Sequence, residues 1–383
     1  MKRRDFLRWI AVSGGLTFFP ALARAAAYDR LLILVELKGG NDGLNTVVPY
    51  ADDAYYRLRP RLAVRRDEVL QLDGRSGLHG ALQPLMPLWQ AGELAVIQGL
   101  GYPNPNLSHF RSIEIWDTAA KSTEYLQTGW LARAFAAHPP PAAFAADGVL
   151  VGGTELGPLA GGARAIALTN QEQFQRQARL AQPMGDGRNA ALAHLRKVET
   201  DVAQAAARLS QVSPHPLRTE FPRGEFGNAV RTASRVLAGG AGVAALRLTL
   251  NGFDTHQNQP GQHANLLRQL GEGLAALKSA LVELQRWDGT LILTYAEFGR
   301  RPQENQSNGT DHGTANAHFA LGGRVRGGLY GAPPALDRLD GNGNLPFAVD
   351  FRSLYATVLE RWWGVAAAPV LGVRYDVLPL LKA

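Results

Sequence analysis

The 383-residue chain contains no cysteine. It can therefore form neither disulfide bonds nor thiolate metal sites, and a bound metal ion would have to take oxygen and imidazole ligands. Nine histidines supply enough imidazole for such a site. Long apolar runs are absent too, because no stretch reaches the roughly 18 uninterrupted apolar residues that a membrane-spanning helix needs. The sequence thus excludes a disulfide framework and offers no candidate for a spanning helix.

A strong excess of positive charge is also missing once the first residues are set aside. The formal net charge is +7, but residues 1–25 hold five Lys/Arg and one acidic residue. The remainder carries 35 basic and 32 acidic residues, a net charge of +3. Its arginines are scattered, with no basic run interleaved with aromatic side chains. We therefore expect no nucleic-acid partner.

The first 25 residues have the composition of a twin-arginine export signal. A basic segment that contains Arg3 and Arg4 precedes an apolar segment from Trp9 to Pro20, and Ala23-Arg24-Ala25 supplies a small-x-small cleavage pattern. We predict a signal peptide over residues 1–25, export by the twin-arginine translocase, and a periplasmic or secreted mature protein without a stable membrane anchor. The alternative is a chance basic start on a cytoplasmic protein.

Apolar runs that alternate with amphipathic segments predict the fold class. Buried strands are expected over residues 31–37, 94–98, 243–250 and 290–295. Leucines at helical spacing from Leu266 to Leu284 predict a long helix between the last two of these strands. This alternation is typical of an α/β fold with a mostly parallel central sheet and helices on both faces. Within one domain over 26–383, residues 138–240 are expected to form a mostly helical insertion, with helical periodicity over 169–209, either as a cap or as a buttress.

The candidate chemistry follows the predicted strands. Residues 310–318 come after the strand 290–295 and a Gly/Asn loop, and they contain Asp311, His312 and His318. Open α/β sheets bind ligands beyond the carboxyl ends of their strands, so we expect this stretch to anchor a metal site. The alternative for His312 is an ordinary contact, such as a helix cap or a hydrogen bond to a backbone carbonyl.

Two further segments offer metal ligands. Asp254 and His256 are two residues apart, so in an extended segment their side chains point to the same side and could chelate one ion. An Asx turn followed by a surface histidine is the alternative. Asp42 lies in a Gly-rich loop directly after the first strand, where a carboxylate can face a cation, although an ordinary turn aspartate would look the same.

Ser108 is the candidate nucleophile. It follows a Pro/Asn turn at the start of a predicted helix, where backbone N–H groups favour an anion and a serine Oγ could lie beside a metal. The alternative is a simple N-cap serine. His109 either belongs to the site or packs beneath it. Glu297 and Arg300, just beyond a strand, either support the ligands or form unrelated salt bridges.

Five motifs taken together resemble the family known as "domain of unknown function 1501". In chain order they are Gly39-Gly40-Asn41-Asp42-Gly43, Ser108-His109-Phe110, Gly252-Phe253-Asp254-Thr255-His256, Glu297-Phe298-Gly299-Arg300 and Asp311-His312-Gly313. The likeness covers nearly the whole chain after the signal. That family is typically exported by the twin-arginine route and is grouped with the alkaline phosphatase and sulfatase superfamily. The resemblance therefore implies an alkaline-phosphatase-like three-layer sandwich.

The same resemblance implies roles for individual residues. Asp42, Asp311 and His312 would hold one ion together with the nucleophile Ser108, and Asp254, His256 and His318 would hold a companion ion. The Asp-x-His spacing is shorter than that of the superfamily's phosphatases, which weakens the case for the second ion. Ser108 has Arg111 three residues on but no proline between them, which disfavours a sulfatase.

The expected function is an exported metal-dependent hydrolase that acts on phosphate or related esters through a metal-bound serine. It would use one or two divalent ions, such as Zn²⁺ or Mn²⁺, and a small-molecule or envelope-derived substrate. The alternative is a non-catalytic periplasmic protein that keeps the fold and binds envelope components, glycans or a partner protein. A glycosidase is weaker, because the acidic candidates come with histidines.

Overall fold

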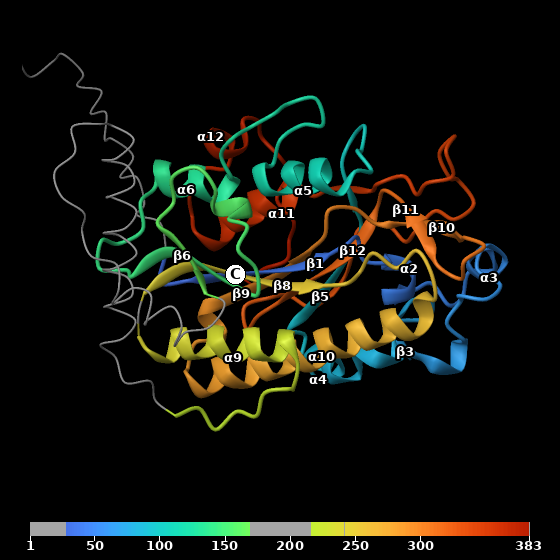
Figure 1. Ribbon diagram of the computed structural model, residues 1–383, viewed down its shortest axis with the longest axis horizontal. Coiled ribbons are helices and arrows are strands. Elements are labelled where there is room, and N and C mark those ends of the chain that lie inside the picture. The colour runs from blue at the N-terminus through green and yellow to red at the C-terminus, as the bar shows by residue number, and fades with distance from the viewer. Residues whose placement is uncertain (1–27, 169–215, 241, 383) are drawn as a thin grey trace, which may run out of the picture.

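The computed structural model describes residues 28–168, 216–240 and 242–382 (Figure 1). The predicted signal peptide over residues 1–25 and the helical periodicity predicted over residues 169–209 lie outside these ranges. No helix within the described ranges is long and apolar enough to cross a membrane.

A nine-stranded sheet forms the centre of the described structure. Its order is β13-β5-β12-β9-β1-β8-β6-β7, and β14 pairs with β5. The strands are β1 (Leu31–Lys38), β5 (Leu94–Gly101), β6 (Ala146–Val151), β7 (Ala165–Leu168), β8 (Val243–Asn251), β9 (Thr290–Tyr295), β12 (Asn316–Leu321), β13 (Gly328–Tyr330) and β14 (Val349–Asp350). β1 runs parallel to both β8 and β9, whereas β12 runs antiparallel to its neighbours β5 and β9. The other strands share one direction, so β12 is the reversed strand of this sheet.

Helices cover both faces of the sheet, as the strand sequences require. In β1, Leu31 and Ile33 pack into the core on one face, while Leu32 and Leu34 pack into the core on the other. Alternate residues of a strand point to opposite faces, so a continuous apolar run needs helices on both sides. α9 (Glu225–Ala238) and α10 (Gln259–Glu283) lie on one side of the sheet, and α5 (His109–Thr118), α6 (Trp130–Ala137) and α11 (Arg352–Thr357) on the other (Figure 1). The predicted three-layer α/β class is confirmed.

Shorter elements decorate this frame. They are α2 (Gly43–Thr46), α3 (Asp53–Leu58), α4 (Met86–Gln90), α12 (Ala368–Leu371), the small sheet β2 (Val47–Val48), β4 (Gly77–His79) and β3 (Val69–Gln71), and the hairpin β10 (Arg300–Glu304) with β11 (Thr310–His312). The hairpin directly precedes β12. Because β12 is reversed, its first residue lies at the carboxyl ends of its neighbours, and the hairpin is delivered to that edge of the sheet.

Residues 146–168 do not form the mostly helical structure expected for the insertion over 138–240. They form β6 and β7, which extend the sheet in parallel beyond β8. These strands were missed because they are short, rich in small residues and flanked by Ala, Gly and Pro, which do not indicate a strand. Gly148 illustrates the packing: a Cβ there would lie 2.4 Å from a methyl carbon of Leu159. Near the end of the same range, Glu225–Ala238 form the helix α9.

Candidate metal centre

Asp254 lies at the centre of a polar cluster at the carboxyl edge of the sheet. It follows β8 in a turn that sits on the loop after β1. Gly39 in that loop has φ +115°, and a Cβ there would lie 2.4 Å from the backbone nitrogen of Asp254, so only glycine allows this approach. Burial tends to raise the pKa of Asp254. The hydrogen bond and charge of Arg300, whose Nη2 is 2.6 Å from Oδ1, outweigh burial and lower the pKa to about 2. The carboxylate is therefore ionised at neutral pH.

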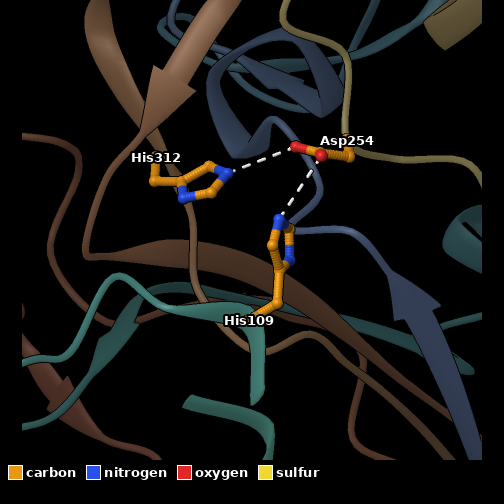
Figure 2. A group of neighbouring side chains, drawn as sticks. All are labelled: His109, Asp254 and His312. Carbon is orange, nitrogen blue, oxygen red and sulfur yellow. Dashed lines mark hydrogen bonds and ion pairs between the residues drawn. The ribbon is translucent and has the colours of Figure 1, made fainter. Parts of the chain in front are cut away.

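Three imidazole rings surround this carboxylate. His109 comes from the first turn of α5, His256 from the loop after β8, and His312 from β11. The Nε2 atom of His109 is 3.3 Å from Oδ2 of Asp254, and those of His256 and His312 are 3.1 and 3.2 Å from Oδ1. Figure 2 shows the rings of His109 and His312 turned toward Asp254. The ligand atoms of His109, Asp254 and His312 all lie within 4.8 Å of one another, a spacing suited to one metal ion.

The second nitrogen of each ring faces an oxygen. The Nδ1 atoms of His312, His109 and His256 are 2.8, 2.8 and 3.4 Å from the Leu107 carbonyl, Glu297 Oε1 and Asp311 Oδ1. These oxygens accept hydrogen bonds, so a neutral ring with its proton on Nδ1 satisfies them and leaves Nε2 with a lone pair. The Nε2 atoms of His256 and His312 lie 2.9 Å apart, a spacing at which two lone pairs need a proton or a metal ion between them. Three lone pairs then converge on one carboxylate. Arg300 pairs with the Oδ1 side of that carboxylate, while the three imidazole nitrogens add nitrogen donors to its oxygens. Such a donor set fits a divalent ion that takes nitrogen and oxygen ligands.

The positions of the rings are held by buried groups beneath them. Glu297 accepts a hydrogen bond from the Gly39 N–H at 2.9 Å and also orients His109. The buried Arg300 donates to the carbonyl oxygens of Gly40, Thr310 and Phe253 at 2.7, 2.9 and 3.1 Å, and to that of Gly39. The hydrogen bond to Glu297 raises the pKa of His109, whereas burial lowers that of His312. Metal binding would therefore have to displace a proton from His109 at acidic pH.

The site is open to solvent on its outer side. The side chain of Asp254 is 46% exposed and that of His312 is 22% exposed. Ser108 is exposed at the N-cap of α5, directly before His109, and its hydroxyl has no hydrogen-bond partner within the described residues. No side chain caps the first turn of α5. The helix therefore presents free N–H groups and the positive end of its dipole beside the cluster.

Asp42 lies in a different environment. Its carboxylate is fully buried, with Arg59 Nη1 2.6 Å from Oδ2 and Nη2 3.0 Å from Oδ1. Gln259 Nε2 also donates to Oδ2 at 2.6 Å, and the Leu44 N–H donates to Oδ1 at 3.2 Å. Burial tends to raise the pKa of Asp42, but Arg59 more than offsets this and lowers it. The structure thus surrounds the Asp42 carboxylate with hydrogen-bond donors. Its role as a metal ligand stays a prediction.

His318 also lies apart from the cluster. It is fully buried in β12, with Nδ1 3.4 Å from the Thr294 hydroxyl and its ring 5.7 Å from that of Trp116. Burial lowers the pKa of His318 to about 3, so the ring is neutral. Its Nε2 has no hydrogen-bond partner within the described ranges. A metal-ligand role for His318 remains a prediction.

The structure thus brings together most, but not all, of the predicted residues. Asp254, His256, Asp311 and His312 meet in one cluster, and Ser108 is next in the chain to His109, which also belongs to it. His109, Glu297 and Arg300, whose roles the sequence left open, belong to the same cluster. Arg59 was not anticipated, because an arginine in a polar loop carries no sign of the carboxylate that it neutralises.

Comparisons with known proteins place the chain in a wider context. The family described as "Protein of unknown function (DUF1501)" matches residues 92–373, a range that contains the whole imidazole cluster but not Asp42. Among curated proteins, none matches the chain. Similar solved structures include a protein in the alkaline phosphatase superfamily from Vibrio parahaemolyticus, with 12% identity, 97% of this chain and 78% of that chain covered, and a TM-score of 0.42.

Two further structures that resemble this chain come from other bacteria. One is the C-terminal periplasmic domain of EcEptC from Escherichia coli in complex with Zn, with 11% identity, 76% of this chain and 72% of that chain covered, and a TM-score of 0.37. The other is alkaline phosphatase from the Antarctic bacterium TAB5, with 11% identity, 79% of this chain and 94% of that chain covered, and a TM-score of 0.30. At these TM-scores no activity is carried over from them to this chain.

Proposed function

This chain belongs to the family described as "Protein of unknown function (DUF1501)", and we propose that it hydrolyses phosphate or related esters with the help of a divalent metal ion. The observation that carries the proposal is the convergence of three imidazole Nε2 atoms on the Asp254 carboxylate, beside an exposed serine. Lone pairs and a negative charge collected at one solvent-open point are suited to holding a cation.

His109, Asp254, His256 and His312 would hold one ion. When bound, an ion such as Zn²⁺ or Mn²⁺ supplies a positive charge that polarises a phosphoryl oxygen. We propose one ion rather than two, because the carboxylate of Asp42 is already paired with Arg59 and His318 is buried in β12. Asp311 would act through His256, whose Nδ1 it faces.

Ser108 would supply the nucleophile. Its hydroxyl is exposed and free of hydrogen bonds to the described residues, and the uncapped first turn of α5 offers N–H groups to an anion. An ester phosphate held there would present its phosphorus to the Ser108 Oγ, which lies next in the chain to the ligand His109. The Oγ–P bond would form as the bond from phosphorus to the ester alcohol breaks, and the serine proton would pass to the departing alcohol. Water would then cleave the phosphoseryl group, which restores the Ser108 hydroxyl and releases phosphate. Glu297 would fix the ring of His109 rather than take part in the reaction.

Export is a separate proposal. We propose that the twin-arginine translocase carries the folded chain to the periplasm or beyond, where a small or envelope-derived ester would be its substrate. Replacing both Arg3 and Arg4 with Lys should leave the protein in the cytoplasm, as measured by immunoblotting of cell fractions. Unchanged export of that variant would contradict the assignment of the signal.

The catalytic proposal is tested with zinc-loaded protein and p-nitrophenyl phosphate. We expect Ser108→Ala to lower kcat at least about 100-fold while the zinc content stays unchanged. Asp254→Ala should lose both zinc and activity. The matched control is Ser279→Ala, an exposed serine on α10, which should change neither. If fully loaded protein hydrolyses no phosphate, phosphodiester or sulfate ester, the alternative gains support: an exported, non-catalytic protein that binds envelope components, glycans or a partner protein.

A further inference from the structure

Phe110 is the most exposed large apolar side chain among the described residues. It is 87% exposed, although it lies in the regular first turn of α5, directly after the ligand His109. Phenylalanine normally packs against other apolar groups, so exposure of nearly the whole ring calls for a reason. Nothing within the described residues packs on it as a ring partner, whereas the neighbouring His109 ring contacts Phe298 and His312 at centroid distances of 5.0 and 4.5 Å.

The direction of the ring follows from helix geometry. In an α-helix each Cα–Cβ bond tilts toward the N-terminus, so the Phe110 side chain leans toward the end of α5 that carries Ser108. That is also the end where the three imidazole rings and Asp254 gather. The ring therefore leans toward the helix end that borders the candidate metal centre, and its 87% exposure leaves it in solvent.

The two chain neighbours of Phe110 anchor this helix turn. His109, one residue before, is hydrogen-bonded to the buried Glu297 at 2.8 Å. Arg111, one residue after, lies 3.9 Å above the ring of Tyr125 and donates to the Ser122 carbonyl at 3.0 Å. An aromatic side chain on such a fixed support loses little freedom when a ligand packs against it.

We propose that Phe110 is a binding platform for the alcohol part of the substrate, and that the site prefers esters whose alcohol carries a flat ring over esters of short alkyl alcohols. This inference rests on the proposed function, because the metal centre would hold the phosphate while the ring packs on Phe110. Offset stacking on one exposed aromatic ring corresponds to an affinity gain of about fivefold.

The test measures binding, which does not depend on turnover. Phenylphosphonate and methylphosphonate are titrated by calorimetry into the zinc-loaded full chain, for the wild type and for Phe110→Ala, Phe110→Leu and Phe110→Trp. We expect the wild type and Phe110→Trp to bind phenylphosphonate about fivefold more tightly than methylphosphonate. In Phe110→Ala and Phe110→Leu this ratio should fall to about one to two, while methylphosphonate affinity stays unchanged. Val282→Ala, an exposed apolar residue on α10 on the other side of the sheet, is the control and should keep the ratio.

Two results would overturn the platform. One is an unchanged ratio in Phe110→Ala. The other is a wild-type ratio near one together with loss of binding of Phe110→Ala to phosphatidylglycerol vesicles, which would assign the ring to a membrane surface. The outcome is separate from that of the proposed function. A protein that prefers phenylphosphonate through Phe110 but hydrolyses no ester would retain the platform and refute the hydrolase.

Discussion

Asp42 and Asp254 follow neighbouring parallel strands, β1 and β8, and each meets a buried arginine, yet their surroundings are opposite in kind. Every group near the Asp42 carboxylate donates a hydrogen bond, and together Arg59, Gln259 and the Leu44 N–H saturate it. Around Asp254, Arg300 is the one donor with a fixed charge in the part of the chain that the structure describes, and the other neighbours are imidazole rings whose Nδ1 atoms face other oxygens.

The difference shows how to separate a structural carboxylate from a metal ligand. Position after a strand at the carboxyl edge is common to both aspartates and decides nothing. What decides is the balance of donors and acceptors around the oxygens. Removing a buried carboxylate that is already neutralised leaves its partner's charge unpaired, whereas we propose that a carboxylate facing further lone pairs is completed by a cation. Four changes probe this contrast.

The largest expected effect comes from Asp42→Ala. The change leaves the Arg59 guanidinium buried without its counter-ion, and we expect it to lower the free energy of unfolding by about 3–5 kcal/mol. Urea unfolding of the metal-free protein measures this loss of free energy. The matched change Asp254→Ala should cost only about 1 kcal/mol, because the side chain of Asp254 is 46% exposed, whereas that of Asp42 is fully buried. Equal losses in the two variants would remove the distinction.

His312→Ala tests the other region. Removing a ligand should weaken zinc binding by at least about 100-fold, more than the loss of a supporting group does. Competition with a chelating dye measures the dissociation constant. His138→Ala, a half-buried histidine outside the cluster, serves as the control and should bind zinc as the wild type does. Tight zinc binding by His312→Ala would show that the ion lies elsewhere.

Glu297→Gln asks whether the buried carboxylate supports the centre. The substitution keeps the shape of the side chain but removes the charge that orients His109, so zinc affinity should fall by about 10–100-fold. The same dye competition measures it, and thermal unfolding of metal-free protein shows whether the hydrogen bond from Gly39 survives. Zinc affinity equal to that of the wild type would make Glu297 a purely structural residue.

The smallest expected change in stability comes from a third aspartate, which extends the comparison. Asp117 in α5 is buried, and burial raises its pKa to about 7 despite the nearby Arg247. A carboxyl group with a raised pKa in the folded state favours folding at low pH. That contribution is lost as pH rises from the unfolded value of about 4 through 7. Asp117→Asn should therefore be more stable than the wild type at pH 8, by at least about 1 kcal/mol, and the gap should shrink at pH 5.

Urea unfolding of both proteins at the two pH values checks this prediction. Tyr295, whose hydroxyl lies 3.4 Å from Asp117 Oδ1, can donate to the amide oxygen of the variant equally well. A variant less stable than the wild type at pH 8 would mean that pairing with Arg247 stabilises the ionised form of Asp117, so that its pKa is lowered and not raised. Asp117 would then be a carboxylate paired with an arginine, as Asp42 is, and not a carboxyl group that burial keeps protonated.

Much of the fold could be predicted from the sequence because its strands are continuous apolar runs. The strand predicted over 290–295 matches β9, and the leucine pattern from Leu266 to Leu284 falls within α10 and its C-cap residue. β6 and β7 could not be predicted, since small residues such as Ala146 and Gly148 form a strand only by pairing with β8. Sheet membership of that kind is a tertiary property, which periodicity along the chain does not contain.

The candidate site was predictable to the extent that its residues lie close together in sequence. Asp254 with His256, and Asp311 with His312, come as short motifs, and these pairs meet in the structure. The environment of Asp42 depends on Arg59, 17 residues further along the chain, which no local pattern connects to it. Which nitrogen of each ring is free also depends on distant oxygens such as that of Leu107.

The most direct test of the account is the metal content of the mature protein, purified without chelators and measured by elemental mass spectrometry. We expect about one divalent ion per chain in the wild type and almost none in Asp254→Ala or His312→Ala. Asp42→Asn, which keeps the shape of the buried side chain, should retain the ion if it folds. Loss of the ion from folded Asp42→Asn, together with its retention in His312→Ala, would contradict the proposed centre.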